Sequence, residues 1–226
     1  MVQSNCTVFY LFIYFRLTCI YKSLHVFTCI HLRPHSKSML IIYAHPNKEG
    51  HCGYFLEQTK KQLQKNEVDF EILDLYEMNY DPVLKNEEHY TSGKKNIDDV
   101  NLQIQEKIKQ NDKLIFIYPT WWNSLPAILK GFLDKVFTGG FAFKYTGKIP
   151  TPLLQNKAVI FTTSGAPRIY SRLVGRSRSI KVLKDDTLKF CGIKSKAFAV
   201  GNGNKLTDKN KKKIESQVVK GLNYLK

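Results

Sequence analysis

The chain has 226 residues, of which 43% are hydrophobic and 12% aromatic; this composition excludes a disordered protein and suits one α/β domain with a sizeable core. The formal net charge of +16 indicates either a lysine-rich solvated surface or attraction of an anion, such as a phosphorylated cofactor or a membrane surface. Nucleic-acid modules usually interleave aromatic residues with Lys and Arg on an exposed face. Here the aromatic residues fall in predicted strands and in one loop, so we expect no nucleic-acid partner.

The cysteines are few, odd in number and not closely paired, which favours a reducing compartment, such as the cytoplasm, over a disulfide scaffold. They are Cys6, Cys19, Cys29, Cys52 and Cys191. The first three lie near histidines but lack the short Cys-x-x-Cys spacing of a zinc site, so we expect no metal.

Residues 1–38 form a segment of different composition, with no acidic residue. Its apolar run, residues 8–15, is interrupted by Arg16 well short of the length that a membrane-spanning helix needs. A secretory signal would require a basic start and a small-residue cleavage site, and neither is clear. Met39 directly precedes the first predicted strand. We therefore predict that residues 1–38 lie outside the fold and that residues 39–226 form the domain.

Hydrophobic periodicity in residues 39–226 predicts strands alternating with helices. The predicted strands cover residues 40–44, 68–75, 114–118, 157–163 and 194–200. The predicted helices cover residues 54–63, 97–109, 126–137, 179–190 and 206–225, with a surface loop over 76–95. Such alternation requires a parallel sheet covered on both faces. We predict a three-layer α/β fold of the flavodoxin-like type, with a five-stranded parallel sheet in the order 2-1-3-4-5.

The stretch over residues 113–145 is the centre of this arrangement. Pro119 ends the buried strand, because it has no amide hydrogen to donate, and Pro126 suits the start of the next helix. Trp121 and Trp122 lie in the loop between them. In the order 2-1-3-4-5, ligands bind where the strand order reverses, between strands 1 and 3. The loops after those strands, residues 45–53 and 119–125, are therefore the predicted site.

The loop after the first strand has the features of a phosphate site, because Gly50 and Gly53 lead into a helix N-terminus. It has neither a dinucleotide G-x-G-x-x-G nor a Walker sequence. His45 either bonds a phosphate oxygen or caps the turn. His51 and Cys52 are expected to contribute through their main chain, and we expect no catalytic thiol. A loop of small residues after the fourth strand, which lets a ring approach the backbone, forms the third wall. It consists of Thr162, Thr163, Ser164 and Gly165.

Five segments, in this order, resemble the flavodoxin-like NAD(P)H:quinone oxidoreductase family, which includes the DT-diaphorases and the bacterial quinone reductases that accompany potassium-efflux systems. They are LIIYAHP, DLYEMNYDPVL, YPTWWNSLPAILKGFLDKVFTGGFAF, TTSGAP and FCGI. The resemblance covers roughly residues 39–201. It implies a non-covalently bound flavin, two-electron reduction of a quinone or similar acceptor by NADH or NADPH, and usually a homodimer.

The resemblance also implies residue roles. His45 corresponds to a phosphate-side histidine, and Tyr170 stands near the nicotinamide and quinone site, where it bonds the quinone oxygen, passes a proton or only packs. The loop that would hold the isoalloxazine ring is Pro119, Thr120, Trp121, Trp122 and Asn123. The loop at the pyrimidine edge is Thr162, Thr163, Ser164 and Gly165. Gly50, His51, Cys52 and Gly53 depart from the Ser and Asn that many members have.

The implied mechanism is ping-pong hydride transfer. FMN is expected rather than FAD, because a single helix follows the last predicted strand. Four arginines after the fourth strand either receive the 2′-phosphate of NADPH or form a solvated basic loop; they are Arg168, Arg172, Arg176 and Arg178. Two alternatives stay open. One is a flavin-binding regulatory subunit of a membrane transporter, with a peripheral membrane partner and little turnover; the other is a nucleic-acid-binding protein.

Overall fold

The structure, a computed structural model, describes residues 38–89 and 97–226. The predictions for the N-terminal segment, including the absence of a metal site at Cys6, Cys19 and Cys29, concern residues outside this range and stay predictions. Among the residues that are described, no helix combines the length and the apolar character needed to cross a lipid bilayer.

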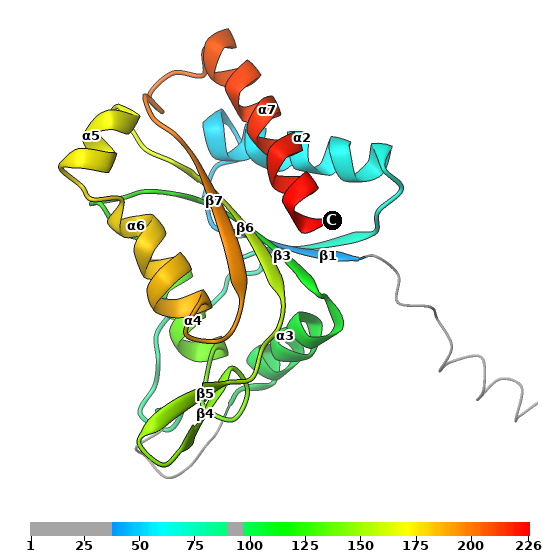
Figure 1. Cartoon of the computed structure of the whole chain (residues 1–226), viewed down its shortest axis with the longest axis vertical. Coiled ribbons are helices and arrows are strands. Elements are labelled where there is room, and N and C mark those ends of the chain that lie inside the picture. Colours follow the sequence, from blue (N-terminus) through cyan, green and yellow to red (C-terminus); the bar gives the residue numbers. More distant parts are fainter. Residues whose placement is uncertain (1–37, 90–96) are drawn as a thin grey trace, which may run out of the picture. The chain divides into compact units, whose positions relative to one another are not determined.

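A five-stranded parallel sheet forms the centre of the domain, in the order β2-β1-β3-β6-β7 (Figure 1). Its strands are β1 (Met39–Tyr43), β2 (Phe70–Asp74), β3 (Lys113–Pro119), β6 (Lys157–Thr163) and β7 (Lys194–Val200). Each neighbouring pair is parallel, with Met39 opposite Phe70 and Lys113, and Lys157 opposite Lys113 and Lys194. Counted along the chain this is 2-1-3-4-5, so the predicted strand order is confirmed.

The three central strands are buried on both faces, which explains why the sequence shows unbroken apolar runs there instead of alternation. Residues 114–118 of β3 and 158–161 of β6 are buried throughout. The edge strands β2 and β7 are only partly covered. On β7 the Lys196 ammonium lies over the rings of Phe198 and Tyr224, at 5.7 and 5.8 Å from their centroids.

Helices cover both faces of the sheet and form two separate cores (Figure 1). One face carries α2 (Gly50–Lys65) and α7 (Asp208–Leu225), where Phe55 stacks on Phe161 at 4.9 Å between ring centroids. The other face carries α3 (Asp99–Gln110), α4 (Ala127–Val136) and the π-helical segment η2 (Val182–Leu188). The three layers that the sequence predicts are therefore present.

A buried lysine attaches the polar segment after β2 to the second core. Lys135 of α4 is only 3% exposed; its Nζ lies 3.1 Å from a Glu88 carboxylate oxygen and 3.6 Å from one of Asp98. Tyr80, from the same polar segment, is also buried and donates a 2.7 Å hydrogen bond to Asn101 of α3. The described part of the predicted surface loop is thus held to the domain by two contacts, Glu88 with Lys135 and Tyr80 with Asn101. The first is required, because a buried ammonium needs a carboxylate partner.

Three local features differ from the sequence-based expectation. The predicted helix over 179–190 is a short α-helix, α6 (Arg178–Lys181), that widens into the π-helical η2. A second, antiparallel sheet consists of β4 (Phe143–Thr146) and β5 (Ile149–Pro152), which turn at Gly147 with φ of +71°. The prolines of β5 argue against a strand when only the sequence is considered, but an exposed edge strand tolerates them. The helix α5 (Arg168–Leu173) was not predicted either.

Candidate cofactor-binding site

The sheet ladder brings the predicted site loops together at the carboxyl ends of β1, β3 and β6. The Ala44 amide donates to the Ile117 carbonyl at 3.0 Å, and the Thr120 amide donates to the Thr163 carbonyl at 2.6 Å. The Ser164 amide continues the series, at 3.0 Å from the Val200 carbonyl. Each loop is therefore fixed at its first residue by the neighbouring strand.

The loop after β1 is folded by its own side chains. The His45 Nδ1 lies 2.5 Å from the Asn47 carbonyl and 3.0 Å from the Asn47 amide, so the imidazole caps this turn through Nδ1 and leaves Nε2 for a ligand. The Asn47 side-chain oxygen accepts from the Glu49 amide at 2.6 Å. The capping role that the sequence allowed for His45 is thus present, and phosphate contact stays a prediction.

The N-terminus of α2 follows this loop and is open to an anion. The N-cap residue Glu49 makes no side-chain capping bond, and the first turn holds no acidic residue. The first four amides of an α-helix lack intrahelical partners and carry the positive end of the helix dipole. Gly53 is required here, since a Cβ at this position would lie 1.4 Å from the Lys48 carbonyl oxygen. Gly50 has a φ of +87°, which also favours glycine.

The side chains of His51 and Cys52 point away from the loop into the core. The His51 Nε2 lies 2.9 Å from the side-chain Nδ2 of Asn210 in α7, and burial lowers the pKa of this histidine. The Cys52 Sγ lies 3.2 Å from the Thr163 hydroxyl, and burial raises the pKa of the thiol to about 12. A thiol that stays protonated at neutral pH is a poor nucleophile. Only the main chain of these two residues is therefore available to a ligand.

The loop after β3 is a tight turn that separates the two tryptophans. The Trp121 amide donates to the Ser124 carbonyl at 3.2 Å, and the Ser124 amide donates back at 2.9 Å. Trp122 and Asn123, the two central residues, have φ of +48° and +58°. Two left-handed residues in succession are typical of a type I′ turn and cost conformational energy in residues other than glycine.

The turn places Trp121 inside the site and Trp122 outside it. The Trp121 ring lies 5.9 Å from the His45 ring between centroids, tilted by 55°, so the loops after β1 and β3 are in contact. Trp122 is fully exposed, and the structure does not bring its indole to the other predicted site residues. Asn123 donates through its side-chain amide to the Gly175 carbonyl at 2.9 Å, which connects this turn to the segment after α5.

Hydroxyl groups connect the β3 and β6 sides of the site below the loops. The Thr120 hydroxyl lies 3.1 Å from that of Thr162 and 2.8 Å from that of Ser179. The Thr162 and Thr163 side chains are buried and engaged with the protein. The Ser164 hydroxyl donates to the Ala166 carbonyl at 3.0 Å, whereas Gly165 is exposed. Ligand contact from this wall is therefore left to the backbone around Gly165.

Tyr170 lies on α5, a six-residue helix that buries none of its residues, and its side chain is 55% exposed. Its carbonyl accepts the amides of Val174 and Gly175 at 2.9 and 3.2 Å, so the segment that reaches Asn123 begins at this residue. The predicted catalytic tyrosine is thus linked to the β3 loop through the backbone, and its role in catalysis stays a prediction.

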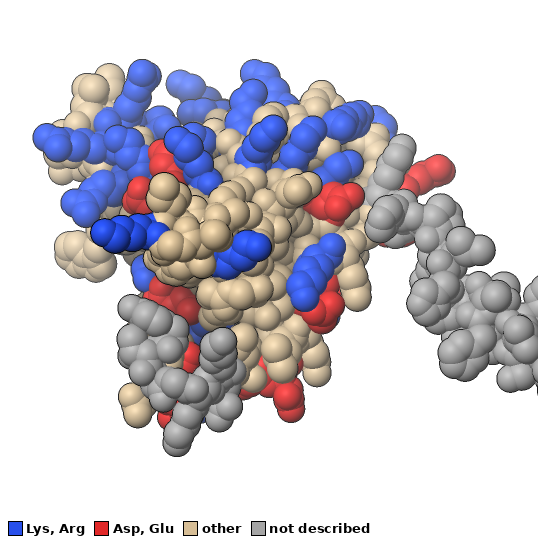
Figure 2. Space-filling model, turned by 60° about the horizontal axis from the view of Figure 1, so that its bottom comes forward, with Lys and Arg blue, Asp and Glu red and all other residues tan. Residues whose placement is uncertain are grey.

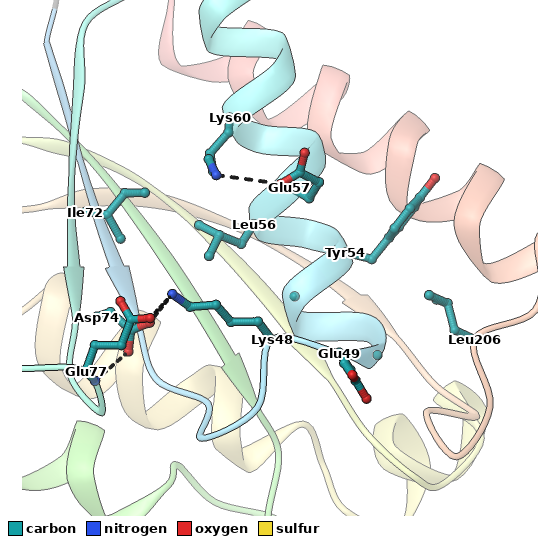
Figure 3. A pocket seen from close by; sticks show the side chains of 12 residues that line it. Lys48, Glu49, Tyr54, Leu56, Glu57, Lys60, Ile72, Asp74, Glu77 and Leu206 are labelled. Carbon is teal, nitrogen blue, oxygen red and sulfur yellow. Dashed lines mark hydrogen bonds and ion pairs between the residues drawn. The ribbon is translucent and has the colours of Figure 1, made fainter.

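A hollow of about 540 Å³ opens on the far side of the phosphate loop, beside α2 (Figure 3). Gly50 and Gly53 line one end of it, and Trp121 and Thr162 are not among its lining residues. Lys48 extends across it to Asp74, at 3.2 Å, and to Glu77 (Figure 3). The hydrogen bond with Glu77 raises the pKa of Lys48. The sequence analysis did not predict this ion-pair cluster. The one feature that could have indicated it is Asp74, an acidic residue at the end of β2, the strand next to β1.

No metal ligand set occurs in the described part of the chain, where no three His, Cys, Asp or Glu side chains come together in a suitable group.

Comparison with known proteins places the chain and its fold in a family. A model of the flavodoxin-like fold matches residues 37–223. An uncharacterized NAD(P)H oxidoreductase of Haemophilus influenzae is 35% identical over 177 residues, which are 76% of this chain and 88% of the relative. Ribosyldihydronicotinamide dehydrogenase (quinone) of Rattus norvegicus is 30% identical over 201 residues, covering 79% of this chain and 87% of the relative.

Among solved structures, the NAD(P)H:quinone oxidoreductase from Methanothermobacter marburgensis superposes with a TM-score of 0.74 at 28% identity, over 84% of this chain and 97% of that one. The sheet order and the loops at its reversal point define a flavodoxin-like protein. The relatives narrow this class further: the chain belongs to the flavodoxin-like NAD(P)H:quinone oxidoreductase family. It is therefore an oxidoreductase of the NAD(P)H dehydrogenase (quinone) type.

Proposed function

We propose that the protein binds FMN non-covalently between the loops after β1, β3 and β6 and reduces quinones by two electrons at the expense of NADH or NADPH. The observation that carries the proposal is the convergence of these three loops at the point where the strand order reverses. Co-substrate and acceptor would use the same face of the site in turn, which is a ping-pong scheme.

The phosphate end of the site fits the cofactor. The uncapped amides at the start of α2 can donate to a phosphate; the first helical turn holds no acidic residue, and the side chain of the N-cap residue Glu49 is exposed to solvent. The close contact between Gly53 and the Lys48 carbonyl forms a cradle that any other side chain would fill. His45 would add its Nε2, because its Nδ1 is held by Asn47. Gly50, His51 and Cys52 would contribute their amides.

The ring end of the site offers mainly backbone. The segments 119–123 and 162–165 would hold the isoalloxazine, with Trp121 as an aromatic wall beside His45. Gly165 is exposed, with the Asn204 side-chain oxygen 3.1 Å from where a Cβ would lie, and amides there would stabilise negative charge at the pyrimidine edge. A bound flavin supplies the capacity to accept and to give a hydride, and the protein supplies orientation and electrostatics. Tyr170 would hydrogen-bond a quinone oxygen or transfer a proton through its Oη.

FMN is favoured over FAD by the charge next to the phosphate loop. The hollow next to the phosphate loop is lined by four carboxylates and two ammonium groups (Figure 3); they belong to Glu49, Glu57, Asp74, Glu77, Lys48 and Lys60. Lys48 is already neutralised by two of these carboxylates. A second phosphate that extended from the phosphate loop into this hollow would therefore meet net negative charge.

The test is an absorption spectrum of the purified full-length protein, followed by extraction of the flavin and measurement of its mass. We expect a yellow protein that carries FMN, bleaches when NADPH is added and consumes NADPH continuously once a quinone is supplied. A folded preparation that stays colourless and takes up no flavin would refute the proposal. Bleaching without continuous turnover would favour the flavin-binding regulatory subunit. Sedimentation of the same sample tests the expected homodimer.

A further inference from the structure

The first turn of α2 has little that holds its shape locally. Its N-cap residue Glu49 makes no side-chain capping bond, and the turn contains Gly50 and Gly53. Glycine loses more conformational freedom on folding than any other residue, and a missing cap leaves the first amides of a helix without partners. Yet the two side chains between these glycines are buried, with His51 4% and Cys52 3% exposed. The order of this turn therefore depends on what His51 and Cys52 contact.

Two side-chain contacts attach the turn to neighbouring elements. The Cys52 Sγ lies 3.2 Å from the Thr163 hydroxyl of β6. The His51 Nε2 lies 2.9 Å from the side-chain Nδ2 of Asn210 in α7, the helix that packs beside α2 (Figure 1). A thiol is a weak hydrogen-bonding group, whereas an imidazole nitrogen and an amide are good ones. The contact with Asn210 is therefore the stronger of the two.

The position of Asn210 is itself fixed by the start of α7. Its backbone amide donates to the hydroxyl of the N-cap residue Thr207 at 3.3 Å. Its side-chain Nδ2 also lies 3.4 Å from the Asn202 carbonyl oxygen. A carbonyl can only accept, so the two hydrogens of Nδ2 go to Asn202 and to His51. The His51 Nε2 accepts one of them, which requires a neutral imidazole with its proton on Nδ1.

The loop after β7, residues 201–207, is fixed against the ring end of the candidate site. The Asn202 amide donates to the Ala166 carbonyl at 3.1 Å, and the Gly203 amide donates to the Ser164 carbonyl at 2.8 Å. A Cβ on Gly203 would lie 2.9 Å from the same Ser164 oxygen, so the two loops are in close contact. No role was predicted for this loop. It contacts the loop after β6 directly and the start of α2 through Asn210.

We propose that Asn210 is a positioning residue for the phosphate-binding turn of α2. Its side chain holds His51, and through His51 it holds the backbone amides of residues 50–53 in the orientation that a phosphate requires. The inference rests on the proposed function, because the phosphate is that of the bound flavin. It deepens that function by assigning a role to the loop after β7: one side-chain amide joins the phosphate end of the site to its ring end.

A general electrostatic effect is the main competing explanation. Four residues near Asn210 in the sequence are basic: Lys209, Lys211, Lys212 and Lys213. Figure 2 shows a face of the molecule on which Lys and Arg crowd the upper half and Asp and Glu are fewer. Such a field attracts an anion without orienting any amide. Asn210→Ala leaves every charge in place and removes only the side-chain contacts with His51 and Asn202, so it separates the two explanations.

The experiment is titration of FMN and of riboflavin into the flavin-free full-length protein, because riboflavin has the same ring and no phosphate. Asn210→Ala and His51→Leu should each lower FMN affinity about 3–10-fold, the effect of one net hydrogen bond, and change riboflavin affinity less than about twofold. His51→Gln places an acceptor near the position of Nε2 and should keep FMN affinity within about twofold of the wild type. A merely structural role would move both flavins together.

The matched control is Gln217→Ala, which removes a hydrogen bond of α7 to the Ala199 carbonyl, at 3.2 Å, and leaves the contact with α2 intact. We expect no change in either affinity. Unchanged FMN affinity in Asn210→Ala, an equal loss for both flavins, or an equal loss in Gln217→Ala overturns the inference.

A folded wild-type protein that binds neither flavin refutes the proposed function, and inorganic phosphate then decides the inference. Phosphate should shift the amide NMR signals of residues 50–53 to saturation in the wild type and more weakly in Asn210→Ala. The absence of a response in the wild type, or equal responses in the two proteins, overturns the inference.

Discussion

Replacement of Gly53 by Ala is expected to disable the phosphate loop. The new Cβ would lie 1.4 Å from the Lys48 carbonyl oxygen, whereas an ordinary contact between such atoms is about 3.4 Å, so the loop must move by about 2 Å relative to α2. Overpacking of this kind costs about 1–3 kcal/mol of unfolding free energy. If two charge-assisted hydrogen bonds to the phosphate are lost, at about 1.5–3 kcal/mol each, flavin affinity falls about 10²–10⁴-fold.

The assay is titration of flavin into the flavin-free protein, with fluorescence quenching as the readout, alongside urea denaturation. Gly147→Ala is the matched control: Gly147 has a φ of +71° in the β4–β5 hairpin, with open space where a Cβ would point. It should cost about 1–2 kcal/mol of stability and leave flavin affinity unchanged. Wild-type affinity in the Gly53→Ala protein would refute the assignment of this loop to the phosphate.

Four further predictions follow from buried or positioned side chains. Lys135→Met should lower the unfolding free energy by about 3–5 kcal/mol in urea denaturation, because a carboxylate loses its buried partner. The control Lys130→Met removes a lysine from an exposed ion pair and should lower the unfolding free energy by less than about 1 kcal/mol. Equal losses in the two variants would contradict this account. Cys52, with its pKa raised to about 12, should resist iodoacetamide at pH 8 until the protein is unfolded; rapid labelling of the native protein would contradict burial. The folded-state pKa of His51 is lowered from 6.5, so the neutral imidazole contributes its full stabilisation above pH 6.5 and loses it as the pH falls. His51→Asn should therefore flatten the pH dependence of the urea midpoint below pH 6.5. Tyr170→Phe should lower kcat with a quinone about 10–100-fold at unchanged flavin content, and an unchanged kcat would leave Tyr170 a packing residue.

The strands were the most predictable part of the fold. β6 and β7 match the predicted ranges to the residue, since both are long runs bounded by turn residues. The helix α5 escaped prediction because it has no buried side, and hydrophobic periodicity reports burial on one side of a helix. The β4–β5 hairpin escaped because its prolines argue against a strand.

The location of the candidate site was predictable, but the directions of its side chains were not. Strand order alone brings His45 and Trp121 together, and their rings are in fact neighbours. The outward position of Trp122 depends on the left-handed turn, and the inward position of His51 depends on Asn210, which is 159 residues away in the sequence. Such long-range contacts leave no local pattern. The residue roles within the site stay predictions until the flavin experiments are done.

The three site loops are clamped to the sheet at Ala44, Thr120 and Ser164, each through a backbone amide that continues the strand ladder. Beyond these points, residues 45–49, 121–124 and 164–167 are exposed or half-buried, whereas the core begins again with His51 and Cys52 of α2. These loop segments can therefore be replaced while the sheet and the two cores stay unchanged. Grafts from relatives with other acceptors, cut at those three residues, should fold on this sheet and carry their acceptor preference with them.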